Sequence, residues 1–232
     1  MEWLESEYLY LGLMLFSMAY PIAQSFERRL RYYQNWKGLF LGILAMMLIF
    51  IPWDIYFTAK GVWWFNDRYI TGFKIWHLPI EEWAFFVVVP FACVFLYEVL
   101  NHFVKADVLK PIAQPTFLIL AAVLLVVGAL NFTRNYTAIT FIITSISLVI
   151  LGLKKPKWIG RFFLTYVICW LPFLLINGAL TGNFTSEAVV NYDPEHNLGL
   201  RVLTIPIEDS VYNLLMLLIV ISIYENQRKH SV

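Results

Sequence analysis

Leu78-Pro-Ile-Glu-Glu-Trp83 recurs 127 positions later as Ile205-Pro-Ile-Glu-Asp-Ser210. In both copies a proline and two adjacent acids open a long apolar run, and proline suits the first position of a helix. At the same offset Tyr97-Glu98 corresponds to Tyr224-Glu225. Two matches at one spacing indicate that the chain contains an internal duplication.

The composition is typical of a membrane protein. Of the 232 residues, 60% are hydrophobic and 14% are charged, and the mean hydropathy is +0.67. A soluble domain is roughly half apolar and a quarter charged, so this chain has too little polar surface to cover itself in water. The net charge of +1 gives no reason to expect a nucleic-acid partner. The sequence therefore predicts an all-α membrane protein with lipid around much of its surface.

Seven apolar stretches are expected to form transmembrane helices, because most approach the ~20 residues that cross a bilayer. They are Tyr8–Ser25, Gly38–Phe57, Leu78–Leu100, Thr116–Asn131, Ala138–Leu153, Phe162–Leu180 and Ile207–Tyr224. The fourth and fifth stretches are the shortest, and the polar segment Thr133–Tyr136 between them predicts a tight hairpin.

Basic residues predict the orientation in the membrane. With seven spans, 12 of the 17 Lys and Arg residues fall on one side. They are Arg28, Arg29, Arg31, Lys37, Lys105, Lys110, Lys154, Lys155, Lys157, Arg161, Arg228 and Lys229. Since positive residues stay on the cytoplasmic side, we expect a multi-pass protein of the cytoplasmic membrane, with the N-terminus outside and the C-terminus in the cytoplasm.

The duplication and the topology together predict one membrane domain, residues 1–232, built from two parallel three-helix repeats. Repeat one covers residues 1–103, a connecting span covers 104–134, and repeat two covers 135–232. A single connecting helix gives both repeats the same orientation. Both acidic motifs therefore begin at the outer side of the membrane.

The paired acids Glu81, Glu82, Glu208 and Asp209 are the candidate functional residues. One acid near a helix start could serve only as a cap. Two adjacent acids exceed what a cap needs, and ionisable groups at membrane depth are functional candidates. If the two motifs face each other, the shared site can hold one protonated and one ionised carboxyl, as acid–base catalysis requires. A proton or cation relay in a transporter would use the same residues.

Other polar residues give fewer indications. Asp54 and Asn177 could orient a carboxylate or mark the membrane interface, while Glu98 and Glu225 are expected to be structural. The histidines lack the spacing of a metal site, so no metal is expected; they are His77, His102, His196 and His230. No glycine-rich phosphate loop is present, so no nucleotide or flavin cofactor is expected.

A longer pattern resembles a known family. Its parts are Pro52…Asp54…Gly61…Trp63, Leu78-Pro-Ile-Glu-Glu with Phe85-Phe86, Pro172…Asn177-Gly178…Leu180-Thr181-Gly182, and Arg201…Ile205-Pro-Ile-Glu-Asp…Tyr212. This pattern resembles the small integral-membrane lycopene cyclases. They occur as two three-span subunits in some bacteria, as one fused chain, and as the cyclase half of fungal bifunctional phytoene synthases.

The resemblance implies a lycopene β-cyclase, an isomerase of the intramolecular lyase type, with no net redox change and no cofactor. It implies that Glu81 or Glu82, and Glu208 or Asp209, supply the acid and the base. Aromatic residues are candidates for contact with substrate and stabilisation of a carbocation, although each would also suit simple packing or an interfacial belt; they are Trp63, Trp64, Phe85, Phe86 and Tyr212.

The same resemblance implies that lycopene, drawn from the lipid phase, is the substrate and that membrane lipid surrounds the protein. A second copy of the chain and other carotenoid enzymes are further candidate partners. The alternatives are a heptahelical transporter that uses the acids for ion coupling, and a carotenoid- or retinoid-binding protein without catalysis. Formation of a ring product separates the cyclase from both.

Overall fold

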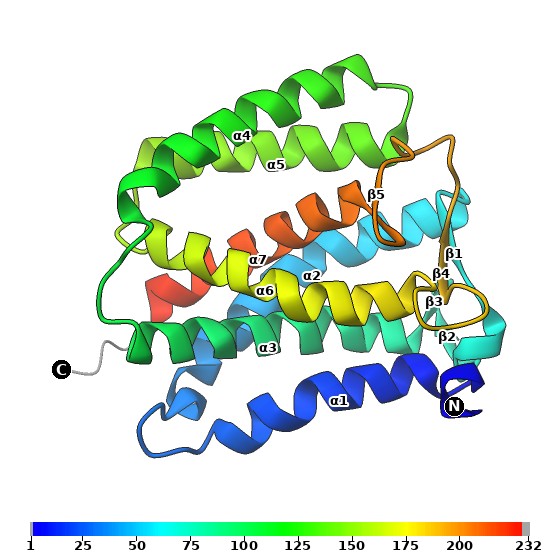
Figure 1. Cartoon of the computed structure of the whole chain (residues 1–232), viewed down its shortest axis with the longest axis horizontal. Coiled ribbons are helices and arrows are strands. Elements are labelled where there is room, and N and C mark those ends of the chain that lie inside the picture. The colour runs from blue at the N-terminus through cyan, green and yellow to red at the C-terminus, as the bar shows by residue number, and fades with distance from the viewer. Residues whose placement is uncertain (1, 229–232) are drawn as a thin grey trace.

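The computed structural model describes residues 2–228, and seven α-helices form the framework of this part of the chain (Figure 1). The helices are α1 Leu9–Gln24, α2 Trp36–Ala59, α3 Ile80–Phe103, α4 Lys110–Leu130, α5 Asn135–Lys154, α6 Ile159–Leu180 and α7 Ile207–Gln227. The seven predicted helices are confirmed. Two residues considered above, Lys229 and His230, lie outside the described residues.

The helix lengths differ from expectation at two places. α4 begins at Lys110, six residues before the apolar stretch, because Pro111 in its first turn suits a helix start. Although they contain the shortest apolar stretches, α4 and α5 are therefore not the shortest of the described helices. They have 21 and 20 residues, whereas α1 has 16. The expected hairpin between α4 and α5 is present, since α4 ends at Leu130 and α5 begins at Asn135.

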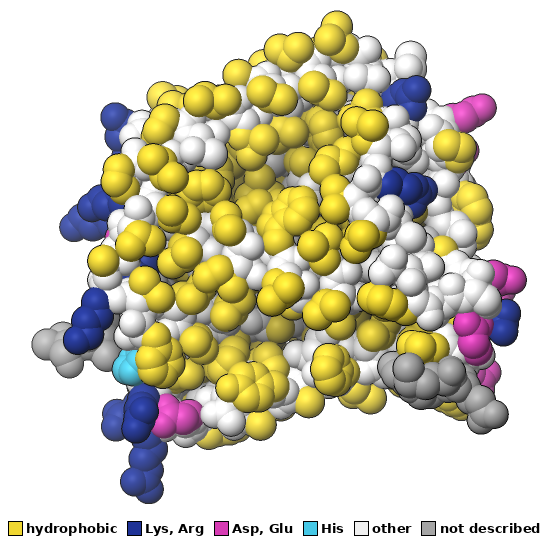
Figure 2. Space-filling view, viewed as in Figure 1, with side chains coloured by type: hydrophobic (Ala, Val, Ile, Leu, Met, Phe, Trp, Pro, Cys, Tyr) yellow, Lys and Arg dark blue, Asp and Glu magenta, His cyan; other side chains and the backbone are white. Residues whose placement is uncertain are grey.

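The surface is that of a membrane protein. Six of the described helices, α2 to α7, are long and apolar enough to cross a bilayer, and α1 is a shorter apolar helix. Figure 2 shows hydrophobic side chains over the middle of the visible face and charged side chains at its two ends. Such a band allows the apolar middle to face hydrocarbon while the charged ends face water.

The helix packing follows the duplication, because α1 packs against α3 and its counterpart α5 packs against α7. α1 lies along α3, and the connecting helix α4 lies along α5 (Figure 1). α2 packs against α7 at the centre, where Gly42 allows a close approach: a Cβ atom at this position would lie 2.8 Å from the Val220 carbonyl oxygen. Small residues are the usual means of close packing between membrane helices.

Six short strands join the loops at one end of the helices. β1 (Trp63–Phe65) pairs antiparallel with β4 (Val190–Tyr192), so that Trp63 lies opposite Tyr192 and the outer loops of the two repeats are linked. Each acidic motif is preceded by a small hairpin. β2 (Lys74–Ile75) pairs with β3 (Leu78–Pro79), and β5 (Arg201–Val202) pairs with β6 (Ile205–Pro206).

The opposite end is joined by an exchange between the repeats. The Tyr97 hydroxyl donates to Oε1 of Glu225 at 2.7 Å, and the Tyr224 hydroxyl donates to Oε1 of Glu98 at 2.9 Å. Arg228 binds both glutamates, with nitrogen–oxygen distances of 2.9 Å to Glu98 and 3.0 Å to Glu225. Glu98 and Glu225 therefore have the structural role expected from their positions.

Candidate active site

The acidic motifs place their acids in the first turns of α3 and α7. The prolines, Pro79 and Pro206, occupy the position just before each helix and not the first helical position. Adjacent residues on a helix point about 100° apart, so the two acids of each motif face different surroundings.

The first acid of each motif binds a loop. Oε1 of Glu81 accepts hydrogen bonds from the backbone N–H and the hydroxyl of Thr71, at 2.8 and 2.7 Å. Oε1 of Glu208 accepts from the backbone N–H of Leu198 at 2.7 Å and from the hydroxyl of Thr137 at 2.6 Å. In both cases the backbone donor lies ten positions before the glutamate. Glu81 and Glu208 are therefore equivalent loop-binding residues.

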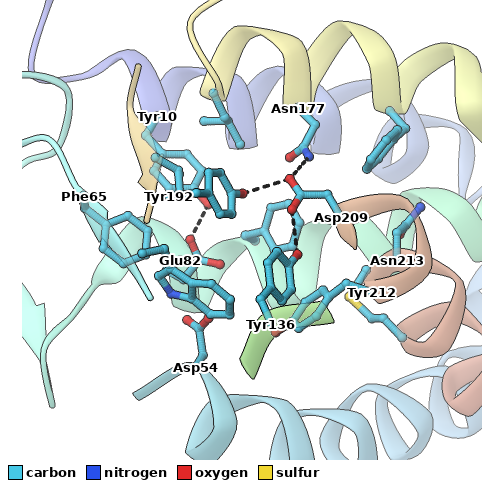
Figure 3. Close-up of a pocket in the computed structure, with 16 residues that line it drawn as sticks. Tyr10, Asp54, Phe65, Glu82, Tyr136, Asn177, Tyr192, Asp209, Tyr212 and Asn213 are labelled. Atoms are coloured by element: carbon cyan, nitrogen blue, oxygen red, sulfur yellow. Dashed lines mark hydrogen bonds between the residues drawn. The ribbon is translucent and has the colours of Figure 1, made fainter. Parts of the chain in front are cut away.

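The second acid of each motif, Glu82 or Asp209, faces a common cavity of about 60 Å³, and Asp54 from α2 lines it as well (Figure 3). All three side chains are buried. The cavity collects seven of the eleven site residues predicted from the sequence, namely Asp54, Trp63, Glu82, Phe85, Asn177, Asp209 and Tyr212.

The cavity acids differ in their hydrogen bonds. Oδ1 of Asp209 accepts from the Tyr136 hydroxyl at 2.6 Å, and Oδ2 accepts from Asn177 and from the Tyr192 hydroxyl, each at 2.8 Å. Glu82 accepts one bond, from the Tyr10 hydroxyl at 2.7 Å (Figure 3).

Asp54 has the sparsest surroundings of the three acids. Its Oδ2 is buried without a hydrogen-bond partner among the described residues. Its side chain lines the same small cavity as that of Glu82.

Tyr192 lies in β4, outside the helices. Burial, and next the charge of Asp209, raise the pKa of its hydroxyl well above the usual value. The hydroxyl therefore remains protonated and donates to the carboxylate.

Aromatic rings form much of the cavity wall. The rings of Tyr136 and Tyr192 are stacked with centroids 6.0 Å apart, and the Trp63 ring meets the Tyr136 ring edge-on at 5.1 Å. Tyr212 contacts Tyr136 at 6.3 Å. The β1–β4 pairing holds Trp63 and Tyr192 in this wall. Aromatic faces attract cations, so the wall is suited to a positively charged intermediate.

A second, apolar cavity of about 450 Å³ lies between α1, α3 and α6. It shares Phe85, Phe173, Asn177 and Asn213 with the polar cavity, so the two are adjacent. Its lining includes Phe16 and Tyr20, which are 75% and 67% exposed on the surface of α1. The apolar cavity therefore lies between the lipid-facing surface of α1 and the cavity that holds the acids.

Four predicted residues lie outside the polar cavity. Two of them are the loop-binding Glu81 and Glu208. Phe86 is fully buried and packs against Phe50, with ring centroids 6.1 Å apart. Trp64 is 49% exposed, because successive residues of β1 point to opposite faces.

Sequence reasoning missed three tyrosines that bind the cavity acids. Tyr10 and Tyr136 lie 72 and 73 positions before the acids that they contact. The two tyrosines are 126 positions apart, one fewer than the offset of the acidic motifs, so the repeat pairs them only after a shift of one residue. Tyr192 comes from a loop without a recognisable pattern. Within residues 2–228, no group of three or more His, Cys, Asp or Glu side chains is arranged to hold a metal ion.

The fold and the site define a polytopic helical membrane protein, in which buried carboxyl groups face an aromatic cavity beside an apolar one. The chain belongs to the lycopene cyclase family, which it matches twice, over residues 7–100 and 133–226. The two matched segments cover α1–α3 and α5–α7 except for the last residues of α3 and α7, and α4 lies between them. The duplication and the family resemblance inferred from the sequence are thus confirmed.

Individual relatives match shorter segments. A lycopene beta-cyclase of Halobacterium salinarum is 41% identical over 46 residues, which are 19% of this chain and 19% of the relative. A bifunctional lycopene cyclase/phytoene synthase of Leptosphaeria maculans is 35% identical over 83 residues, 36% of this chain and 13% of the relative. The matched segments thus span about a fifth or less of these relatives. No solved structure matches the chain.

Proposed function

We propose that this protein is a lycopene β-cyclase, an isomerase of the intramolecular lyase type that converts the ψ-ends of lycopene to β-rings. Its membership of the lycopene cyclase family and the names of its relatives support this function. The observation that carries the proposal is the arrangement of the acids. Glu82, Asp209 and Asp54 meet in one buried aromatic cavity, and that cavity adjoins an apolar one.

The reaction needs an acid and a base but no redox partner. A carboxylic acid protonates C2 of the terminal alkene, which leaves a tertiary cation at C1. The C5=C6 double bond attacks C1, so that the C1–C6 bond closes a six-membered ring and the cation moves to C5. A carboxylate then removes the proton from C6 to form the C5=C6 bond of the β-ring. Atoms and charge balance, because one proton is added and one is removed.

The residues have distinct places in this reaction. The acid and the base come from Glu82, Asp209 and Asp54, since these acids line the cavity. Trp63 and Tyr212 lie in the wall where a cation would form. The polyene lies in the apolar cavity, with Phe85 at the junction between the two cavities. Burial excludes the water that would capture the cation.

The topology proposed with this function has seven spans, the N-terminus outside and the C-terminus in the cytoplasm. It is supported by the excess of basic residues in the loops at one end of the helices. The two repeats, 1–103 and 135–232, then present the cavity near the outer side of the membrane.

Expression in cells that accumulate lycopene tests the function. The wild-type chain should convert lycopene to γ-carotene and β-carotene, which chromatography separates. Glu82→Gln should remove the ring products, while the matched control Trp64→Phe, outside the cavity, should keep them. Unchanged lycopene with wild-type protein verified in the membrane would contradict the proposal. Ion flux in liposomes without a ring product would favour a transporter, and bound but unchanged pigment would favour a carotenoid-binding protein.

A further inference from the structure

The structure divides the roles of the cavity acids: we propose that Glu82, sharing one proton with Asp54, is the general acid, and that Asp209 is the base. This assignment rests on the proposed cyclase function. It also makes Tyr136, Tyr192 and Asn177 positioning residues for the base.

The hydrogen bonds to Asp209 favour its charged form over its neutral form. Its two oxygens accept three hydrogen bonds, at 2.6 to 2.8 Å, from Tyr136, Tyr192 and Asn177. Hydrogen bonds of this kind favour the charged form of a carboxyl group. Protonation of Asp209 would weaken these three hydrogen bonds, so this acid is poorly suited to carry the proton at the start of the reaction.

Glu82 and Asp54 lack that support. Both carboxyl groups are buried, yet the described residues give the pair one hydrogen-bond donor, Tyr10 on Glu82, and none on Oδ2 of Asp54. No Lys, Arg or His side chain is among the described residues that line the cavity. Two buried carboxyl groups that line one small cavity cannot both remain charged without such help, so one proton is held between the two.

The positions of the acids suit the two proton transfers. C2, which gains the proton, and C6, which loses one, are both bonded to C1, so the acid and the base must face one ring from different directions. Glu82 enters the cavity from α3 and Asp209 enters from α7 (Figure 3). The Glu82 carboxyl proton goes to C2, and Asp209 takes the proton from C6. The proton taken from C6 then passes from Asp209 back to Glu82. This transfer restores the starting protonation state without net release of a proton.

Turnover of lycopene in D2O by the purified protein, followed by mass spectrometry, tests the assignment. In the wild type, each new ring should carry deuterium at C2. Glu82→Gln should reduce ring formation by at least ~100-fold and leave the recovered lycopene without deuterium, because the first step is lost. Asp209→Asn should reduce β-rings similarly but still protonate the substrate. Deuterium should then appear in recovered lycopene, or in rings whose double bond lies elsewhere.

Asp54 provides a separate test of the shared proton. Asp54→Asn should slow both turnover and deuterium uptake, and Asp54→Glu should restore part of each. A folded Asp209→Asn variant that takes up no deuterium, or a Glu82→Gln variant that does, would overturn the assignment. If Asp209→Asn fails to fold, Tyr192→Phe replaces it: the base keeps its carboxylate but loses one of three donors, so β-ring formation should fall and part of the protonated substrate should return as deuterated lycopene. A wild type that forms no ring at all would instead overturn the cyclase function.

Discussion

Adjacent acids on α3 have different surroundings although their side chains are chemically alike. Glu81 accepts both donors of Thr71, whereas Glu82 faces the cavity. The sequence predicted the pair but not this division, because the rotation of a helix about its axis is set by packing. The same limit explains why Tyr10 was missed, since its hydroxyl meets Glu82 only after α1 packs on α3.

Glu81→Ala should destabilise the protein and spare the chemistry. The change removes both hydrogen bonds from Thr71, whose backbone N–H is partly buried, and each lost bond costs about 0.5–1.5 kcal/mol. Thermal unfolding in detergent measures the loss, and the pigment assay measures activity at a temperature where the variant is folded. Thr71→Ala, which removes only the hydroxyl donor, should cost less. Full thermal stability together with lost ring formation would show instead that Glu81 takes part in the reaction.

The contribution of Glu5 to the stability of the protein should depend on pH. Glu5, in the short helix η1 (Glu2–Glu5), accepts bonds from the backbone N–H and the hydroxyl of Ser186 and from Tyr69. These bonds, the backbone bond from Ser186 first, lower the pKa of Glu5 from 4.5 to about 2. A lowered pKa adds stability above pH 4.5, and this stability disappears as the pH falls toward 2.

The difference in melting temperature between the wild type and Glu5→Gln should therefore narrow from pH 5 to pH 2. Glu7→Gln, which removes an exposed acid from the same segment, is the control and should show no such convergence. A difference between the wild type and Glu5→Gln that stays constant with pH would contradict the role of Glu5.

At the scale of elements, the contact between α2 and α7 depends on glycine. A Cβ atom at Gly42 would meet the Val220 carbonyl oxygen at 2.8 Å, so the helices would have to separate. We expect Gly42→Ala to lower the stability by about 1–3 kcal/mol, the usual cost of overpacking. Gly12→Ala on α1, where nothing lies within 4 Å of the added atom, is the matched control and should leave the melting temperature unchanged or raised. Equal effects of both changes would contradict this account.

The helices could be predicted because each is a long apolar run, but the strands could not. β1 and β4 have three residues each, too few for an alternating pattern, and their partners lie far apart in the chain. The hairpin turns carry left-handed backbone at Trp76, His77 and Leu203, without the glycine or asparagine that marks such turns. The wall residue Tyr192 was therefore out of reach of sequence reasoning.

At the scale of the whole molecule, Arg228 holds the two repeats together at the end opposite the cavity. It binds Glu98 and Glu225, which also accept from Tyr224 and Tyr97. Arg228→Ala leaves two largely buried carboxylates without their cation and should cost about 3 kcal/mol. Arg228→Lys should recover part of the loss. Thermal unfolding in detergent provides the measurement. An unchanged melting temperature for Arg228→Ala would show that the ion pairs of Arg228 with Glu98 and Glu225 do not stabilise the protein.

The exchange between Tyr97–Glu225 and Tyr224–Glu98 has an evolutionary consequence. Each repeat supplies one tyrosine hydroxyl and one glutamate to the other. The interface of a symmetric homodimer is built from reciprocal contacts of this kind. An ancestor with one repeat per chain could therefore have made both contacts by pairing with its own copy, and its central cavity would then have held two identical acids. Once α4 connected the copies, symmetry no longer required the acids to match. Glu82 and Asp209 could then acquire different hydrogen-bond partners. Two carboxyl groups that began as equivalent could thereby become the acid and the base of the same reaction.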